Sequence, residues 1–99
     1  MSADPEDDVR LYAVYLGGDP APGRLTEDHE VVLVVANDVA DARRRARAKW
    51  GASTRPHVDG VMVVDVVDGF AITLTPTTRP ESVDVDLTYE PQDAAPTDE

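Results

Sequence analysis

The segment HVDGVMVVDVVDGFAITL, residues 57–74, combines mostly apolar residues with the clearest turn signal in the sequence. The dipeptide Asp68-Gly69 separates two apolar runs, and Asp-Gly in such a setting is a strong predictor of a β-hairpin. The segment therefore predicts two antiparallel strands joined by a tight turn. It also contains His57 and Asp59, the only His-x-Asp pair of the chain.

Two registers of this hairpin are compatible with the sequence. A two-residue loop pairs Val67 with Phe70 and puts an acidic residue on the face of Phe70. A three-residue loop, residues 67–69, pairs Val66 with Phe70 and leaves one face entirely apolar. Because a slip of one residue moves every side chain to the opposite face, we favour the three-residue loop, with Gly69 in the left-handed conformation. The apolar face would consist of Met62, Val64, Val66, Phe70, Ile72 and Leu74.

Two further strands are expected in the first half of the chain. Residues 11–16 (LYAVYL) are rich in β-forming residues and end at two glycines, after which a polar loop follows. Residues 29–36 (HEVVLVVA) include five consecutive apolar residues at 31–35. Such a run is typical of a strand that is buried on both faces, so it predicts a central position in the sheet.

One amphipathic helix is expected after the second strand, ending near Trp50. Asn37 and Asp38 are favourable N-caps, and Asp41 lies in the first turn, where a carboxylate suits the helix dipole. Gly51 is a favoured residue for ending the helix. The apolar stripe has spacings of 3, 4 and 4 and consists of Val39, Ala42, Ala46 and Trp50.

The C-terminal residues 82–89 alternate strictly between apolar and polar, which is typical of a half-exposed strand at a sheet edge. The fold class is therefore α+β: a two-layer β-β-α-β-β domain with one helix on a four- or five-stranded, mainly antiparallel sheet. Residues 10–75 form this domain, and residues 76–89 form a linker and the optional fifth edge strand. Residues 1–9 and 90–99 are expected to be disordered acidic tails.

The net charge of −11 lies in the tails, because residues 10–79 contain nine acids and nine bases. An arginine-rich helix favours contact with nucleic acid, but the acidic tails and the lack of an aromatic ladder argue against it. No apolar stretch approaches 18 residues, so no membrane span is expected. The absence of cysteine excludes disulfides and thiolate chemistry, and with a polar start it predicts a cytoplasmic protein.

Several short motifs resemble a known bacterial family. They are YAVYLGG at 12–18, DHE at 28–30, WG at 50–51, HVD at 57–59 and DGF at 68–70. Together they look like the family of domain of unknown function 1543, over about residues 10–75. The chain departs from the family pattern at Glu30, Trp50, Gly60 and Phe70. The resemblance implies a compact module of this element order, and it implies no activity, because none is assigned to the family.

Three polar side chains next to the predicted strands form a candidate site. His29 and His57 precede strands, and they converge with Asp59 if the second and third strands are neighbours. Two imidazoles and a carboxylate can bind Zn or non-haem Fe, and Trp50 completes a candidate ligand site. The simpler interpretation is that each polar side chain caps a loop by hydrogen bonding. No catalytic residue and no cofactor are identified.

The function expected from the sequence is that of a small, non-catalytic interaction or regulatory module that self-associates. One helix covers only one face of the sheet, while the first two strands have apolar residues on both faces. Uncovered apolar patches of several hundred Å² usually mark an interface, so we expect a homodimer. The alternative is a small-ligand or metal site around His29, His57 and Asp59, with or without catalytic activity. The sequence leaves the class of enzyme, if any, open.

Overall fold

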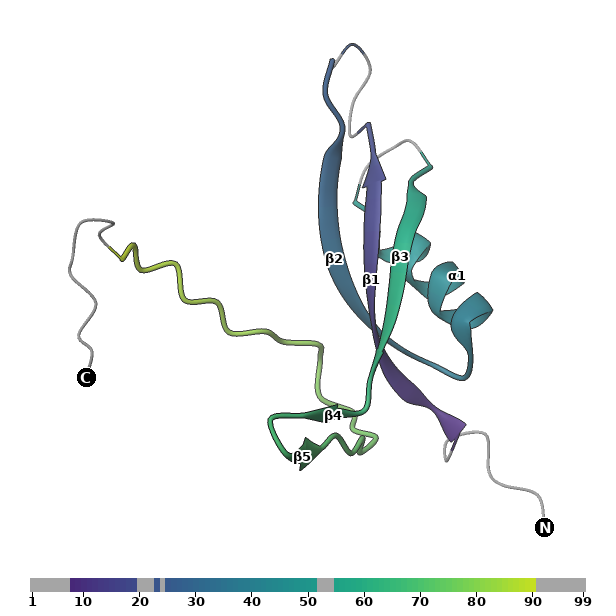
Figure 1. The fold of residues 1–99 in the computed structure, drawn as a ribbon, viewed down its shortest axis with the longest axis vertical. Coiled ribbons are helices and arrows are strands. Elements are labelled where there is room, and N and C mark those ends of the chain that lie inside the picture. The colour runs from purple at the N-terminus through teal and green to yellow at the C-terminus, as the bar shows by residue number, and fades with distance from the viewer. Residues whose placement is uncertain (1–7, 20–22, 24, 52–54, 91–99) are drawn as a thin grey trace.

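The computed structural model describes residues 8–19, 23, 25–51 and 55–90 and has the expected α+β fold (Figure 1). The tails expected at residues 1–9 and 90–99 fall mostly outside these ranges. Within them the element order is β1 (Arg10–Gly18), β2 (Asp28–Ala36), α1 (Val39–Lys49), β3 (His57–Val64), β4 (Val66–Val67) and β5 (Phe70–Ala71). No helix in these ranges is long and apolar enough to span a membrane.

The main sheet is antiparallel, and its strand order is β2-β1-β3. β1 is therefore the central strand, and the prediction that the second strand is central was wrong. Within β2, Val34 and Ala36 are buried, whereas Val31, Leu33 and Val35 are exposed. The apolar run of β2 thus reflects one face covered by the helix and one apolar face left open. It does not reflect strand neighbours on both sides.

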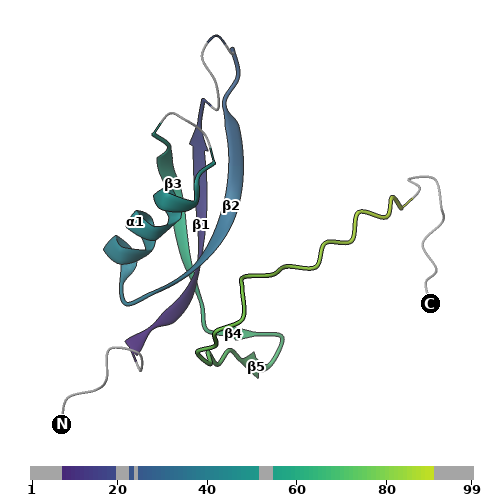
Figure 2. The same cartoon turned by 180° about the vertical axis from the view of Figure 1, so that it is seen from behind.

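The core lies between the sheet and the helix. Figures 1 and 2 show α1 on one face of the three strands, with the opposite face uncovered. Ala42 and Ala46 are fully buried at this contact, and their small side chains allow the helix to approach the sheet closely. Val32, Trp50, Val58 and Val61 are partly buried around the core. The buried hydrophobic residues of this core are Tyr12, Val14, Leu16, Val34, Ala36, Ala42 and Ala46.

The helix begins at the cap that the sequence predicts. The side chain of Asp38 accepts a hydrogen bond of 2.8 Å from the backbone N–H of Asp41. The side chain of Asp41 in turn accepts one of 3.3 Å from the backbone N–H of Asn37. The C-terminal end differs slightly from expectation, because Trp50 is the C-cap and its backbone N–H donates to the carbonyl of Arg47.

The hairpin has the two-residue turn, so the prediction of a three-residue loop was wrong. Val67 pairs with Phe70, and Asp68 and Gly69 have φ of 54° and 82°. Positive φ at both positions is what a type I′ turn requires, and this turn matches the twist of the strands. The hairpin is exposed on both sides, with Phe70 73 % exposed. Burial therefore does not distinguish the two registers, and the geometry of the turn decides between them.

The hairpin also leaves the main sheet. β3 pairs with β1 as far as Val64, and the chain then turns into a separate two-stranded sheet, β4-β5. A three-stranded sheet and a short hairpin thus take the place of the expected four- or five-stranded sheet. The expected apolar face is divided between the two.

Residues 81–90, which we call the arm, are assigned to no helix or strand in the single chain. Figures 1 and 2 show the arm extending away from the sheet. The radius of gyration is 17.5 Å, whereas a compact domain of this length has a value of about 13 Å. The alternating apolar side chains of the arm are between 68 % and 87 % exposed; they are Val83, Val85, Leu87 and Tyr89.

Candidate functional site

The two histidines are brought together by the register of the sheet. Gly17 on the central strand pairs with His29 on β2 and with His57 on β3. Residues opposite each other on neighbouring strands share a face, so both imidazoles lie on the same side of β1. The ring centroids are 6.4 Å apart, and the rings meet edge to face at 73°.

Gly17 makes this approach possible because it has no side chain. A Cβ at this position would lie 2.7 Å from the ring of His29 and 2.8 Å from the ring of His57. Both distances are shorter than any normal contact. The ring of His29 is also stacked on Tyr15, with centroids 5.2 Å apart.

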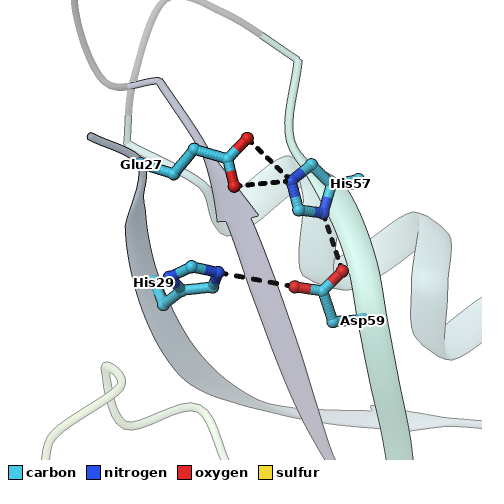
Figure 3. Close-up of polar contacts among 4 residues, drawn as sticks. All are labelled: Glu27, His29, His57 and Asp59. Atoms are coloured by element: carbon cyan, nitrogen blue, oxygen red, sulfur yellow. Dashed lines mark hydrogen bonds and ion pairs between the residues drawn. The ribbon is translucent and has the colours of Figure 1, made fainter. Parts of the chain in front are cut away.

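Glu27, His29, His57 and Asp59 form a chain of polar contacts, which we call the histidine cluster (Figure 3). Nδ1 of His57 lies 2.7 Å from Oδ1 of Asp59, and Nε2 of His57 lies 3.3 Å from both carboxylate oxygens of Glu27. The second oxygen of Asp59 lies 3.6 Å from Nε2 of His29. Asp59 therefore bridges the two imidazoles.

A bulge in β3 orients the acid of this cluster. Leu16 pairs with Val58 and Tyr15 with Gly60, so Asp59 is the additional residue on β3. The bulge lets Val58 and Val61 both pack against the core although they are three residues apart. It leaves Asp59 on the open face with the histidines (Figure 3).

The two carboxylates favour a protonated His57. The hydrogen bond to Asp59 raises the pKa of His57 most, and the hydrogen bond to Glu27 raises it further above the ordinary value of 6.5. The side chain of His57 is 49 % exposed, so solvent screens these interactions. The two carboxylates thus stabilise the protonated form of His57, and the cluster is open to solvent.

Trp50 lies on the other face of the sheet and is not part of the cluster. Consecutive strand residues point to opposite faces, and Gly18 follows Gly17. A Cβ on Gly18 would meet Cζ2 of Trp50 at 3.5 Å and Cα of Pro56 at 3.3 Å. The indole Nε1 of Trp50 is buried and has no hydrogen-bond partner among the described residues.

The contacts of the cluster do not leave an evident metal site. Within the described ranges, no group of three or more His, Cys, Asp or Glu side chains is arranged to hold a metal ion. Both ring nitrogens of His57 face carboxylate oxygens, whereas a metal-binding imidazole needs a free lone pair on the nitrogen that ligates.

The sequence reasoning missed Glu27, which belongs to the cluster, and Gly17, which makes room for its two rings. Glu27 precedes β2 and meets His57 from 30 residues away. The signal for Gly17 was the position of Gly17-Gly18 at the end of the first strand, opposite the histidines once the strands are paired. These residues become neighbours only through the register in which β2 and β3 pair with β1.

The rest of the open face is apolar. We define the open face by its exposed or half-buried side chains on the side opposite α1: Ala13, Tyr15, Val31, Leu33, Val35 and Met62. A shallow hollow of about 300 Å³ lies on it between β1, β2 and β3, lined by Tyr15, Val31, Gly60 and Met62 among others. The histidine cluster borders this apolar surface.

Comparison with known proteins relates the chain to a family. No curated protein and no solved structure matches it. A family model described as Domain of Unknown Function (DUF1543) matches residues 24–74, a range that omits β1 and contains β2 to β5, the helix and the whole histidine cluster. Because this match covers half of the sequence, the chain belongs to the DUF1543 family.

Proposed function

We propose that the protein is a small, non-catalytic interaction module that pairs with a second copy of itself through the open face. The observation that carries this proposal is the continuous apolar surface on the side of the sheet opposite α1. Leu33 on β2 is 50 % exposed, and Val31 on β2 and Met62 on β3 are each 61 % exposed. Contiguous apolar patches of this kind are typical of protein interfaces.

The hairpin and the arm expose further apolar side chains besides those of the open face. Phe70 of the hairpin is 73 % exposed, and Leu87 of the arm is 87 % exposed. A stable interface buries about 1,200–2,000 Å² in total, and these segments can add to the area that the open face supplies.

A second copy is the occupant that this surface favours. None of the side chains that define the open face is charged. The histidine cluster lies at one end of the face, and an ion pair of Arg10 and Asp65 lies at the opposite end of β1 and β3. Two such apolar surfaces can bury each other across a two-fold axis, which is the commonest symmetry of soluble oligomers. The polar cluster then lies at the rim of the interface, where charged groups are usually found.

Light scattering at micromolar concentration tests this proposal. The expected mass is twice 10.7 kDa. Leu33→Asp should give a monomer, because a carboxylate would be buried without a partner. The matched control is Leu25→Asp, since Leu25 lies outside the sheet and is fully exposed, and this variant should remain dimeric. A wild-type mass near that of one chain would contradict the proposal.

The second candidate function is a small-ligand site at the histidine cluster. It is favoured by one observation: four titratable side chains from the start of β2 and from β3 are connected beside an open apolar hollow. Elemental analysis of purified protein tests the metal form of this hypothesis. We expect no stoichiometric metal. Zn or Fe that is present in the wild type and lost in His57→Ala would make the cluster the principal site.

A further inference from the structure

We propose that the arm of one copy adds a strand to the free edge of β2 in a second copy. This exchange rests on the proposed self-association and names the backbone edge that it uses. The first observation is the arm itself, in which Val83, Val85 and Leu87 alternate with polar residues and are exposed. Alternation with period two is the pattern of a strand with one apolar face, yet the arm pairs with no strand in its own chain.

The second observation is the edge of β2. β2 is nine residues long and is the first strand in the order β2-β1-β3, so its outer backbone groups have no strand partner among the described residues. A long apolar edge of this kind is a template for pairing with another chain. At ~3.3 Å per residue, the eight residues 82–89 span about 26 Å, close to the ~30 Å of β2.

The third observation is the position at which the arm begins. Lys49, at the end of α1, donates to the carbonyl oxygen of Leu33 on β2 at 2.6 Å. The same ammonium group lies 3.2 Å from the carboxylate of Glu81. A cation of the helix therefore connects the first residue of the arm to β2, and it fixes the start of the arm beside this strand.

The charges of the arm match the two sides of the sheet at this edge. If the apolar side chains of the arm extend the open face next to Val31, Leu33 and Val35, then Asp84 and Asp86 must point to the opposite side. That side carries α1, whose exposed cations are Arg43, Arg44, Arg45 and Lys49. The reverse orientation would place the two carboxylates on the apolar face. Only one orientation therefore satisfies both surfaces.

We assign the edge to a second copy because the arm cannot pair along its full length with β2 of its own chain. The part of β2 that lies beyond the start of the arm is too short. Glu81 is held near Leu33, the sixth residue of β2. From there only about 10 Å of strand remains in one direction and about 17 Å in the other, which is less than the arm requires. In both views the arm leads away from its own sheet (Figures 1 and 2). Reciprocal exchange in a two-fold dimer lets each arm use a whole edge.

Two truncated chains test the exchange by light scattering on dilution. A chain that ends at residue 90 keeps the arm, and it should keep the dissociation constant of the full chain and a melting temperature within about 4 °C of it. A chain that ends at residue 80 should have a dimer dissociation constant at least about tenfold higher. Equal dissociation constants for all three chains would overturn the exchange while leaving the self-association intact. A monomeric full chain would instead overturn the proposed function.

Disulfide trapping keeps the test decisive if the shorter chain does not fold, because the protein contains no cysteine. Chains carrying Val85→Cys are mixed with chains carrying a single cysteine at position 31, 33 or 35 of β2 and then oxidised. The expected product is a mixed dimer with at least one β2 position. Chains carrying Met62→Cys on β3 are the control and should not be trapped. The inference would be overturned if the arm cysteine is trapped on β3 or only on the arm of another chain. It would also be overturned if a disulfide forms only inside a single chain that carries both cysteines.

Discussion

At the scale of single residues, Gly17 determines whether the histidine cluster can form. Its backbone conformation is ordinary, so Gly17→Ala introduces no backbone strain, but the new methyl group would occupy the space of both imidazoles. We expect the rings to move apart and the pKa of His57 to return toward 6.5. The measurement is an NMR titration of the imidazole protons.

The matched control for this prediction is Gly60→Ala. Gly60 lies on the neighbouring strand, and its added Cβ would meet only the Cβ of Tyr15, at an ordinary 4.0 Å. The pKa of His57 should be unchanged in this variant. A similar change in both variants would mean that the sheet, rather than the space above Gly17, was altered.

His57 makes stability depend on pH with a definite sign. Its pKa is raised in the folded protein by Asp59 first and Glu27 second, so folding favours the protonated form. The resulting stabilisation is complete below the unfolded pKa near 6.5 and is lost as the pH rises through the higher folded pKa. The difference in melting temperature between the wild type and His57→Gln should therefore shrink between pH 6 and pH 9.

Two carboxylate variants provide the internal check on this pH effect. Asp59→Asn should reduce the pH dependence more than Glu27→Gln, because the contact with Asp59 contributes most to the raised pKa. A difference that stays constant with pH would show that His57 is not protonated preferentially in the folded state.

The sequence identified part of the cluster but not all of it. His29, His57 and Asp59 stand out because they lie at strand ends, and the structure brings them together. Glu27 could not be identified, since its contact with His57 depends on how β2 and β3 pair with β1. Trp50 was also expected in the site, although it faces the other side of the sheet.

At the scale of elements, the cap of α1 is a local feature with a predictable effect. Asp38→Ala removes the hydrogen bond to the backbone of Asp41, which should destabilise the protein by about 1 kcal/mol. For a domain of this size, the melting temperature should fall by roughly 4–8 °C. Asp8→Ala removes the same charge from an exposed position before β1 and should have little effect. Equal decreases in the two variants would assign the loss to net charge.

The elements that the sequence predicted well are those determined by local signals. The helix has a cap and an apolar stripe, and its observed bounds agree with them. The position of β2 was mistaken because an apolar run shows only that both faces of the strand carry apolar side chains, and it does not show how many strands flank it. The hairpin register was mistaken because the side chains were assumed to be buried, whereas Val66 and Phe70 are exposed and the turn decides.

At the scale of the whole molecule, the core of the single chain is small. Within the described ranges its core contains seven buried hydrophobic residues, and three of them are alanines. Domains below about 100 residues bury a modest share of their surface and are marginally stable alone. An interface that covers the open face would add apolar burial to this core, so folding and self-association should be coupled.

This coupling predicts that the melting temperature depends on protein concentration. If folded dimers unfold to separate chains, a tenfold increase in concentration stabilises each dimer by about 1.4 kcal/mol and raises the melting temperature by roughly 3–6 °C. Leu33→Asp, which disrupts the open face, should melt at a lower temperature that does not change with concentration. Leu25→Asp should keep the wild-type dependence. If the melting temperature of the wild type does not change with concentration, the single chain with its seven-residue core folds without a second copy.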